Sequence, residues 1–251
     1  MNRPELCLWW EVRDPSRSDD ARRLSQFVTG LPDFDPIYQS WLNSPAGKDE
    51  AVPVPLNETA ARRLLIDNID RSDFDGSAMP EFGSNIWGGH AGPPPYDFSE
   101  SNYAETSCHV GSYLNPGDSS ANHILMGLSA LRVATGRPWR ASELRPMMKF
   151  AREIWSPTAM CVMFPFYMDF PSVPLPLQTE FRRTLDPMLG WITYLPADLA
   201  ARAKYPADVE VETLSDGAVL VTLCEEMFEE TDAEGMKRLH ALEAALRPIQ
   251  S

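Results

Sequence analysis

The strongest constraint on the fold is a stretch that runs from Gly190 to Cys224. It opens with Gly190–Leu195, a run of residues that favour β-structure. Two runs with alternating apolar residues follow, Val209–Glu212 and Ala218–Leu223, and the dipeptide Asp216-Gly217 lies between them. Because Asp-Gly between alternating runs is a strong hairpin signal, the stretch predicts a strand followed by an antiparallel hairpin.

Amphipathic helices are predicted at several places. The clearest runs from Ser142 to Trp155, because six apolar side chains recur there at the spacing of one buried face. These are Leu144, Met147, Met148, Ala151, Ile154 and Trp155, and the other side carries Arg140, Arg145, Lys149 and Arg152. Helices are also predicted over Ser18–Leu31 and Asn57–Ile69, and a capping box at Thr231–Glu234 predicts the start of the last helix.

The other apolar runs favour strands, and proline marks the loops between them. The predicted strands are Glu5–Arg13, Phe82–His90 with a turn at Trp87-Gly88-Gly89, Glu105–Leu114, Asn122–Leu131 and Thr158–Phe164. The run Asn122–Leu131 also fits a helix. Proline-rich loops are predicted at 43–56, 92–98 and 165–187. Strands and helices alternate without a low-complexity linker, which predicts one α+β domain over residues 1–251, with a mostly antiparallel sheet and flanking amphipathic helices.

The charge balance limits the classes of partner. The formal net charge of the 251 residues is −14, which argues against direct binding of nucleic acid and suits a cationic partner. No apolar run reaches the length that a membrane span requires, and the first residues carry charge instead of an apolar signal core. We therefore expect a cytoplasmic protein without a membrane partner.

The residues that could carry chemistry form no motif. The four cysteines (Cys7, Cys108, Cys161 and Cys224) are far apart, which fits reduced thiols better than disulfides or a zinc site. Known nucleotide-binding, hydrolase and metalloprotease motifs are absent, so no catalytic residue, metal or cofactor is predicted. His109 and His123 lie on adjacent predicted strands and, with Cys108, offer one alternative: a small hydrolase or transferase.

Four aspartates follow the second predicted helix: Asp67, Asp70, Asp73 and Asp75. Carboxylates in a cluster can bind Ca²⁺, but here the oxygen spacing of a calcium loop and its distal Glu are missing. The aspartates therefore fit either a solvated loop or a contact with a partner.

Several blocks in order along the chain resemble the immunity protein 52 family of bacterial polymorphic-toxin and type VI secretion systems. The blocks are Trp9-Trp10, Asp35-Pro36, Trp87-Gly88-Gly89, Cys108 to Gly111, Asn122 to Leu128, Trp155 to Ala159 and, the most specific, Gly190 to Leu195 before the Asp-Gly hairpin. The chain departs from the family pattern in its proline-rich insert at Pro93–Tyr96 and at Ser156, where the family often has Asp.

The resemblance implies an immunity protein, which binds and neutralises a cognate toxin and does not act as an enzyme. In this family the toxin is often similar to a nuclease with a restriction-endonuclease fold. Such a toxin has a basic cleft, and an acidic inhibitor fits it. The predicted toxin contacts are Asp67, Asp70, Asp73, Asp75, Tyr96, Asp97 and Glu100. A non-inhibitory adaptor of a secretion cluster is a further alternative.

Overall fold

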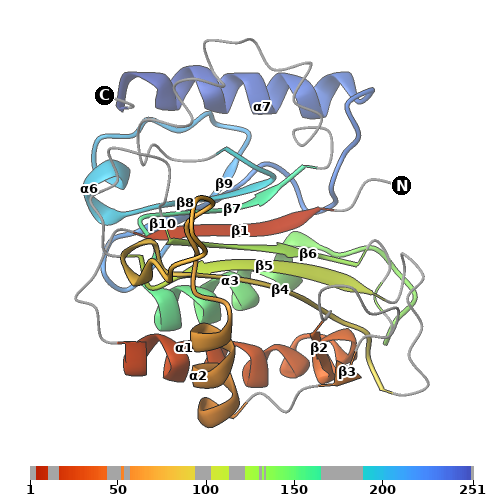
Figure 1. Ribbon diagram of the computed structural model, residues 1–251. Helices are drawn as coiled ribbons and strands as arrows, with labels where there is room; N and C mark the ends of the chain where they lie inside the picture. The colour runs from red at the N-terminus through yellow and green to blue at the C-terminus, as the bar shows by residue number, and fades with distance from the viewer. Residues whose placement is uncertain are drawn as a thin grey trace.

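The protein is described by a computed structural model, shown in Figure 1. The described residues are 4–10, 17–43, 52–53, 57–93, 103–112, 122–129, 132, 134–164 and 189–249. The predicted loop at 165–187 and most of the one at 92–98 lie outside these residues.

One large sheet runs through the whole molecule. Its strands lie in the order β3-β2-β4-β5-β6-β1-β7-β8-β10-β9, and each described pair is antiparallel. The strands are β1 (Glu5–Trp10), β2 (Trp41–Asn43), β3 (Val52–Pro53), β4 (Ser84–His90), β5 (Ala104–Val110), β6 (Asn122–Gly127), β7 (Ala159–Met163), β8 (Ile192–Leu195), β9 (Glu210–Thr213) and β10 (Val219–Thr222). With its helices the fold is α+β, which confirms the predicted class.

Three helices cover one face of the sheet, which we call the lower face after its place in Figure 1. They are α1 (Arg17–Gly30), α2 (Glu58–Asp67) and α3 (Ala141–Trp155). Trp155 at the end of α3 stacks on Trp10 of the central strand β1, with 4.6 Å between the ring centroids. Phe27 of α1 meets the same Trp155 ring edge-on at 6.2 Å. Aromatic packing therefore joins two helices to the middle of the sheet.

The basic side of α3 binds the C-terminal hairpin and the residues that follow it. Arg145 pairs with Glu210, Lys149 with Glu212 and Arg152 with Asp216, while Arg140 lies 3.0 Å from Glu226. These four ion pairs join α3 and the residue that caps it to a segment far along the sequence. Each is partly exposed, so each contributes modestly to stability.

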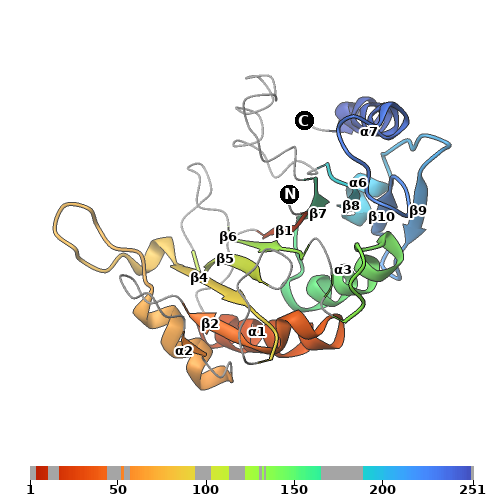
Figure 2. The same ribbon diagram turned by 90° about the vertical axis from the view of Figure 1, so that its right-hand side faces the viewer.

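A last helix, α7 (Ala233–Leu246), lies on the opposite, upper face. Figures 1 and 2 show it above the end of the sheet that contains β8, β9 and β10. Its own Leu239, Leu242 and Leu246 are buried on the side that faces the sheet. The residue that caps the start of α7 is Asp232, one position after the predicted Thr231. Its side chain accepts hydrogen bonds from the backbone amides of Glu234 and Gly235. A carboxylate here also favours the positive end of the helix dipole.

The hairpin predicted around Asp216-Gly217 is present. Val211 pairs with Val221 in the β9–β10 ladder, and Gly217 at the turn has a φ of +88°, which glycine adopts without strain. Two loop predictions need correction. The segment 43–56 contains β3, which pairs with β2, and Trp87-Gly88-Gly89 lies inside β4 instead of forming a turn. Glycine suits this strand because Tyr103 occupies the space where a Cβ of Gly89 would lie.

Gly190 lets the chain pass close to β7 at the start of β8. A Cβ at this position would lie 2.2 Å from the carbonyl oxygen of Val162, and a backbone atom cannot easily move away. We expect Gly190→Ala to lower the free energy of unfolding by about 2–3 kcal/mol through overpacking. Gly127→Ala is the matched control, because its Cβ would meet nothing closer than 3.4 Å. Urea titration of both variants measures the difference, and equal midpoints would contradict the close approach.

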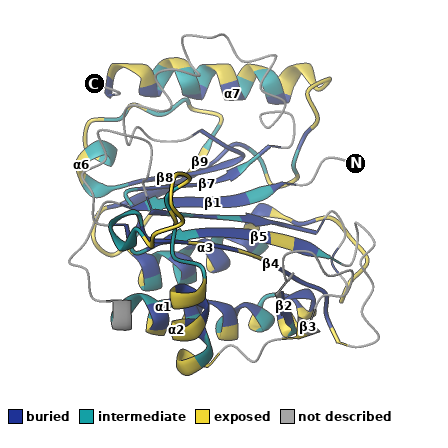
Figure 3. Cartoon of the chain, in the orientation of Figure 1, coloured by how far each residue is buried: buried dark blue, intermediate teal, exposed yellow. Residues whose placement is uncertain are grey.

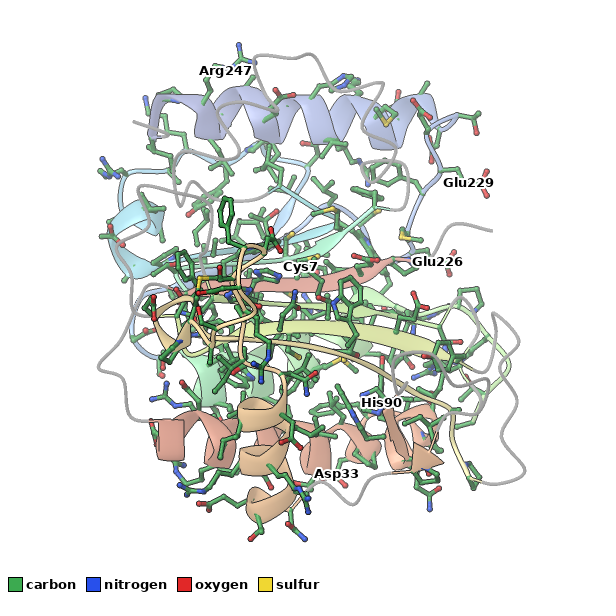
Figure 4. All side chains as sticks on the ribbon, viewed as in Figure 1. Cys7, Asp33, His90, Glu226, Glu229 and Arg247 are labelled. Atoms are coloured by element: carbon green, nitrogen blue, oxygen red, sulfur yellow. The ribbon has the colours of Figure 1, made fainter. Side chains whose placement is uncertain are left out.

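His90 ends β4 and is buried below the sheet, where Figure 4 labels it. Its ring meets Tyr38 and Trp41 edge-on, at 5.1 Å and 5.0 Å between centroids. Tyr38 belongs to the short helix η2 (Pro36–Gln39), which is capped by the side chain of Asp35. Burial lowers the pKa of His90 from 6.5 to about 3, because a charged imidazole would lose its hydration. The folded protein therefore holds this histidine neutral.

Acid should lower the free energy of unfolding, because the unfolded chain can protonate His90 and the folded protein holds it neutral. A depressed histidine pKa gives stability that is present above the unfolded pKa near 6.5 and is lost as the pH falls towards about 3. By pH 5 the loss is about 2 kcal/mol. Chemical denaturation at pH 7 and pH 5 should show a smaller change for His90→Phe than for the wild type. An equal change in both proteins would show that other groups cause the acid sensitivity.

Candidate functional site

Three of the predicted contact aspartates, Asp70, Asp73 and Asp75, fall on the loop between α2 and β4, residues 68–83, and Asp67 ends α2 just before it. Backbone hydrogen bonds close this loop at its base: the amide of Asp70 donates to the oxygen of Gly83 at 3.1 Å, and that of Met79 to the oxygen of Asp70 at 2.8 Å. Farther out, the amide of Ser72 donates to the oxygen of Ser77 at 2.9 Å. The loop is therefore an ordered hairpin-like projection, and Figure 2 shows it rising beyond the edge of the sheet.

The tip of the α2–β4 loop combines negative charge with an aromatic ring. Phe74 is fully exposed, and Asp73 and Asp75 on either side of it are exposed as well. The amide and hydroxyl of Ser77 donate to Asp75 Oδ1 at 3.0 Å and 2.7 Å. These hydrogen bonds lower the pKa of Asp75, which keeps this carboxylate ionised.

The upper faces of β4 and β5 lie beside this loop. Trp87 on β4 is 62% exposed, and Asn85 and Glu105 are exposed too, as the yellow segments of these strands in Figure 3 indicate. Burial, and then the charge of Glu105, raise the pKa of Glu5 on β1. The upper face of this end of the sheet thus carries the exposed carboxylate of Glu105 and a large exposed aromatic side chain.

His109 and His123 lie side by side at the base of the loop, as the sequence predicts. They are register partners on β5 and β6, with 5.6 Å between their ring centroids. His109 Nε2 lies 2.5 Å from the carbonyl oxygen of Phe82 and 3.8 Å from Asp70 Oδ2. The ring of His109 therefore supports the base of the α2–β4 loop, and this contact places the loop on the upper side of the sheet.

Cys108 does not join these histidines, which corrects the proposed nucleophile–base pair. Neighbouring residues of a strand point to opposite faces, so the buried Cys108 faces the helices while His109 faces upwards. Burial raises the pKa of the Cys108 thiol to about 12, so that it stays protonated. A protonated thiol in the core is a poor nucleophile.

The structure brings together four of the seven predicted contact residues. Asp67 ends α2 and is exposed, Asp70 supports the loop base, and Asp73 and Asp75 flank the tip. Tyr96, Asp97 and Glu100 lie outside the described residues. The exposed aromatics Phe74 and Trp87 were missed as site residues. Phe74, an aromatic between two acidic residues in a polar loop, was a readable signal, whereas the exposure of Trp87 depends on which face of β4 the helices cover.

Other kinds of site receive no support in the described part of the chain. Within it, no three His, Cys, Asp or Glu side chains come together in an arrangement that could hold a metal ion. Nor does any described helix have the length and apolar character needed to cross a membrane. The four cysteines are free thiols, and three of them are buried.

Comparison with known proteins places this chain in a family. A search of curated proteins gave no match. Among solved structures, the chain resembles the Pseudomonas aeruginosa T6SS protein PA0821, with a TM-score of 0.49 and 12% identity, covering 97% of this chain and 73% of that one. The family model of Immunity protein 52 matches residues 6–247, nearly the full length. The chain therefore belongs to the immunity protein 52 family.

Proposed function

We propose that this immunity protein neutralises its cognate toxin by stoichiometric binding, and that the toxin presents a basic surface of the kind found on nucleases. Family membership implies an immunity protein that binds a cognate toxin. The nuclease nature of the toxin, its delivery by a type VI secretion system and the cytoplasmic location of the complex are parts of the proposal. They rest on the family resemblance and on the charge.

The observation that carries the proposal is the negative charge of the α2–β4 loop. Between residues 67 and 81 the sequence has five carboxylates and one basic side chain, Arg71. At the other end of the sheet, the four cations of α3 already pair with carboxylates. A nuclease binds a polyanion with a cationic cleft, so an acidic projection can occupy that cleft and is steered towards it.

Neutralising the loop should slow association with the toxin. We expect the triple change Asp67→Asn, Asp73→Asn and Asp75→Asn to lower the association rate constant about tenfold at low ionic strength, with a smaller effect at high salt. The probe is a catalytically inactive form of the toxin domain encoded beside the gene of this chain, and biolayer interferometry provides the rates.

The control variant loses the same number of negative charges at a surface distant from the loop. Glu229, Glu230 and Glu234 are exposed around the start of α7. Figure 4 labels Glu229, which lies away from the α2–β4 loop. Changing these three residues to Gln should alter the association rate less than threefold. If both variants associate with the toxin equally slowly, the net charge of the protein, and not the position of the loop, steers the encounter. No complex between the wild-type proteins at micromolar concentration would contradict the proposed function itself, and binding without loss of toxin activity would favour an adaptor.

Protection of cells from the toxin should not depend on the imidazole groups of His109 and His123. If the protein acts by binding, cells that express the double variant His109→Gln and His123→Gln should survive the toxin as well as cells with the wild type. Survival assays measure this, with circular dichroism and thermal denaturation to confirm that the variant folds. Loss of protection by a folded variant that still binds the toxin with unchanged affinity would support the hydrolase or transferase alternative.

A further inference from the structure

The exposed apolar side chains of this protein are unevenly distributed. Among the described residues, four large hydrophobic side chains are exposed: Ile66, Phe74, Trp87 and Val211. Three of them belong to the continuous segment α2–loop–β4, and only Val211 lies at the far edge of the sheet, on β9. Single exposed apolar residues are ordinary, but two exposed aromatics on one segment that also carries several carboxylates favour a protein contact.

Phe74 and Trp87 are held in different ways on the same side of the sheet. Trp87 projects from the upper face of β4, which is fixed by its ladder to β5. The α2–β4 loop rises on this same upper side, because its base contacts the upper-face residue His109. Figure 1 shows the loop extending past the sheet in that direction. Both rings are therefore presented by ordered backbone, which reduces the entropy lost when a partner binds.

Both aromatics have exposed carboxylates near them, in the sequence or across the sheet. Asp73 and Asp75 flank Phe74, and Glu105 lies on β5 next to the strand that carries Trp87. In protein complexes, buried aromatics supply most of the binding energy, whereas charges at the rim mainly raise the rate of encounter. A surface of this composition fits a protein partner that offers an apolar pocket inside a cationic patch.

We propose that Phe74 and Trp87 are two anchor residues for the cognate toxin, and that each inserts into an apolar part of its cationic surface. This inference rests on the proposed function and names the residues that hold the complex together. We call the region formed by Asp73, Phe74, Asp75, Trp87 and Glu105 the anchor surface. In this arrangement the carboxylates govern association, and the two aromatics govern dissociation.

The test measures dissociation of the inactive toxin domain from three variants. Phe74→Ala and Trp87→Ala should each raise the dissociation rate constant at least tenfold and change the association rate constant less than threefold. Val211→Ala is the matched control, an exposed apolar side chain at the other end of the sheet, and it should leave both rates within threefold of the wild type. Because Phe74 is fully exposed, its removal should leave thermal stability unchanged.

The possible results distinguish a failure of the two anchor residues from a failure of toxin binding itself. If the wild type binds and inhibits the toxin but either aromatic variant dissociates within threefold of the wild-type rate, the two-anchor surface is wrong and the proposed function stands. If the wild type does not bind, the proposed function fails first. Analytical ultracentrifugation of the chain alone tests a second copy as the occupant. A dimer that both aromatic substitutions disrupt would overturn the assignment of this surface to the toxin.

Discussion

The packing of α3 against the central strands is the interaction on which the rest of the structure depends. Its terminal Trp155 stacks on Trp10 of β1 and receives the edge of Phe27 from α1. The opposite side of the same helix carries the cations that bind the β9–β10 hairpin. One helix thus fixes the middle of the sheet and its C-terminal end together. The remaining end, with β4 and β5, can then present its upper face to a partner.

This arrangement also determines where the charge of the protein is available. The chain has 36 acidic and 22 basic residues, so many carboxylates must lack a cation of their own. The cations of α3 pair with Glu210, Glu212 and Asp216, which form part of the fold. Around the α2–β4 loop, Arg71 is the only basic residue between 67 and 81, and its guanidinium donates to the carbonyl oxygen of Gly76. The α2–β4 loop is therefore one place where carboxylates clearly outnumber the nearby cations.

The parts of the fold that follow from local sequence were predictable, and those that depend on distant contacts were not. Asp216-Gly217 specifies its own turn, and the stripe of α3 specifies its own buried face. By contrast, Trp87-Gly88-Gly89 looks like a turn in sequence but is a strand that pairs with β5, and Tyr103 packs where Gly89 has no side chain. The pairing of His109 with His123 followed from adjacent strands, but the separation of Cys108 from them required knowing the face that each residue occupies.

In the candidate site, too, the features set by local sequence were predictable and those set by distant contacts were not. The aspartates were visible as a cluster in the sequence, whereas the exposure of Trp87 is a property of the layers: helices cover the lower face of the sheet, and Trp87 points to the upper one. Phe74 contributes almost no buried area to its own chain, since it is fully exposed on a loop that backbone hydrogen bonds already order. Its apolar surface can therefore be removed from water only by another molecule. Cys108, on the neighbouring strand, differs from these rings: it is buried on the lower side of the sheet, where burial keeps its thiol protonated.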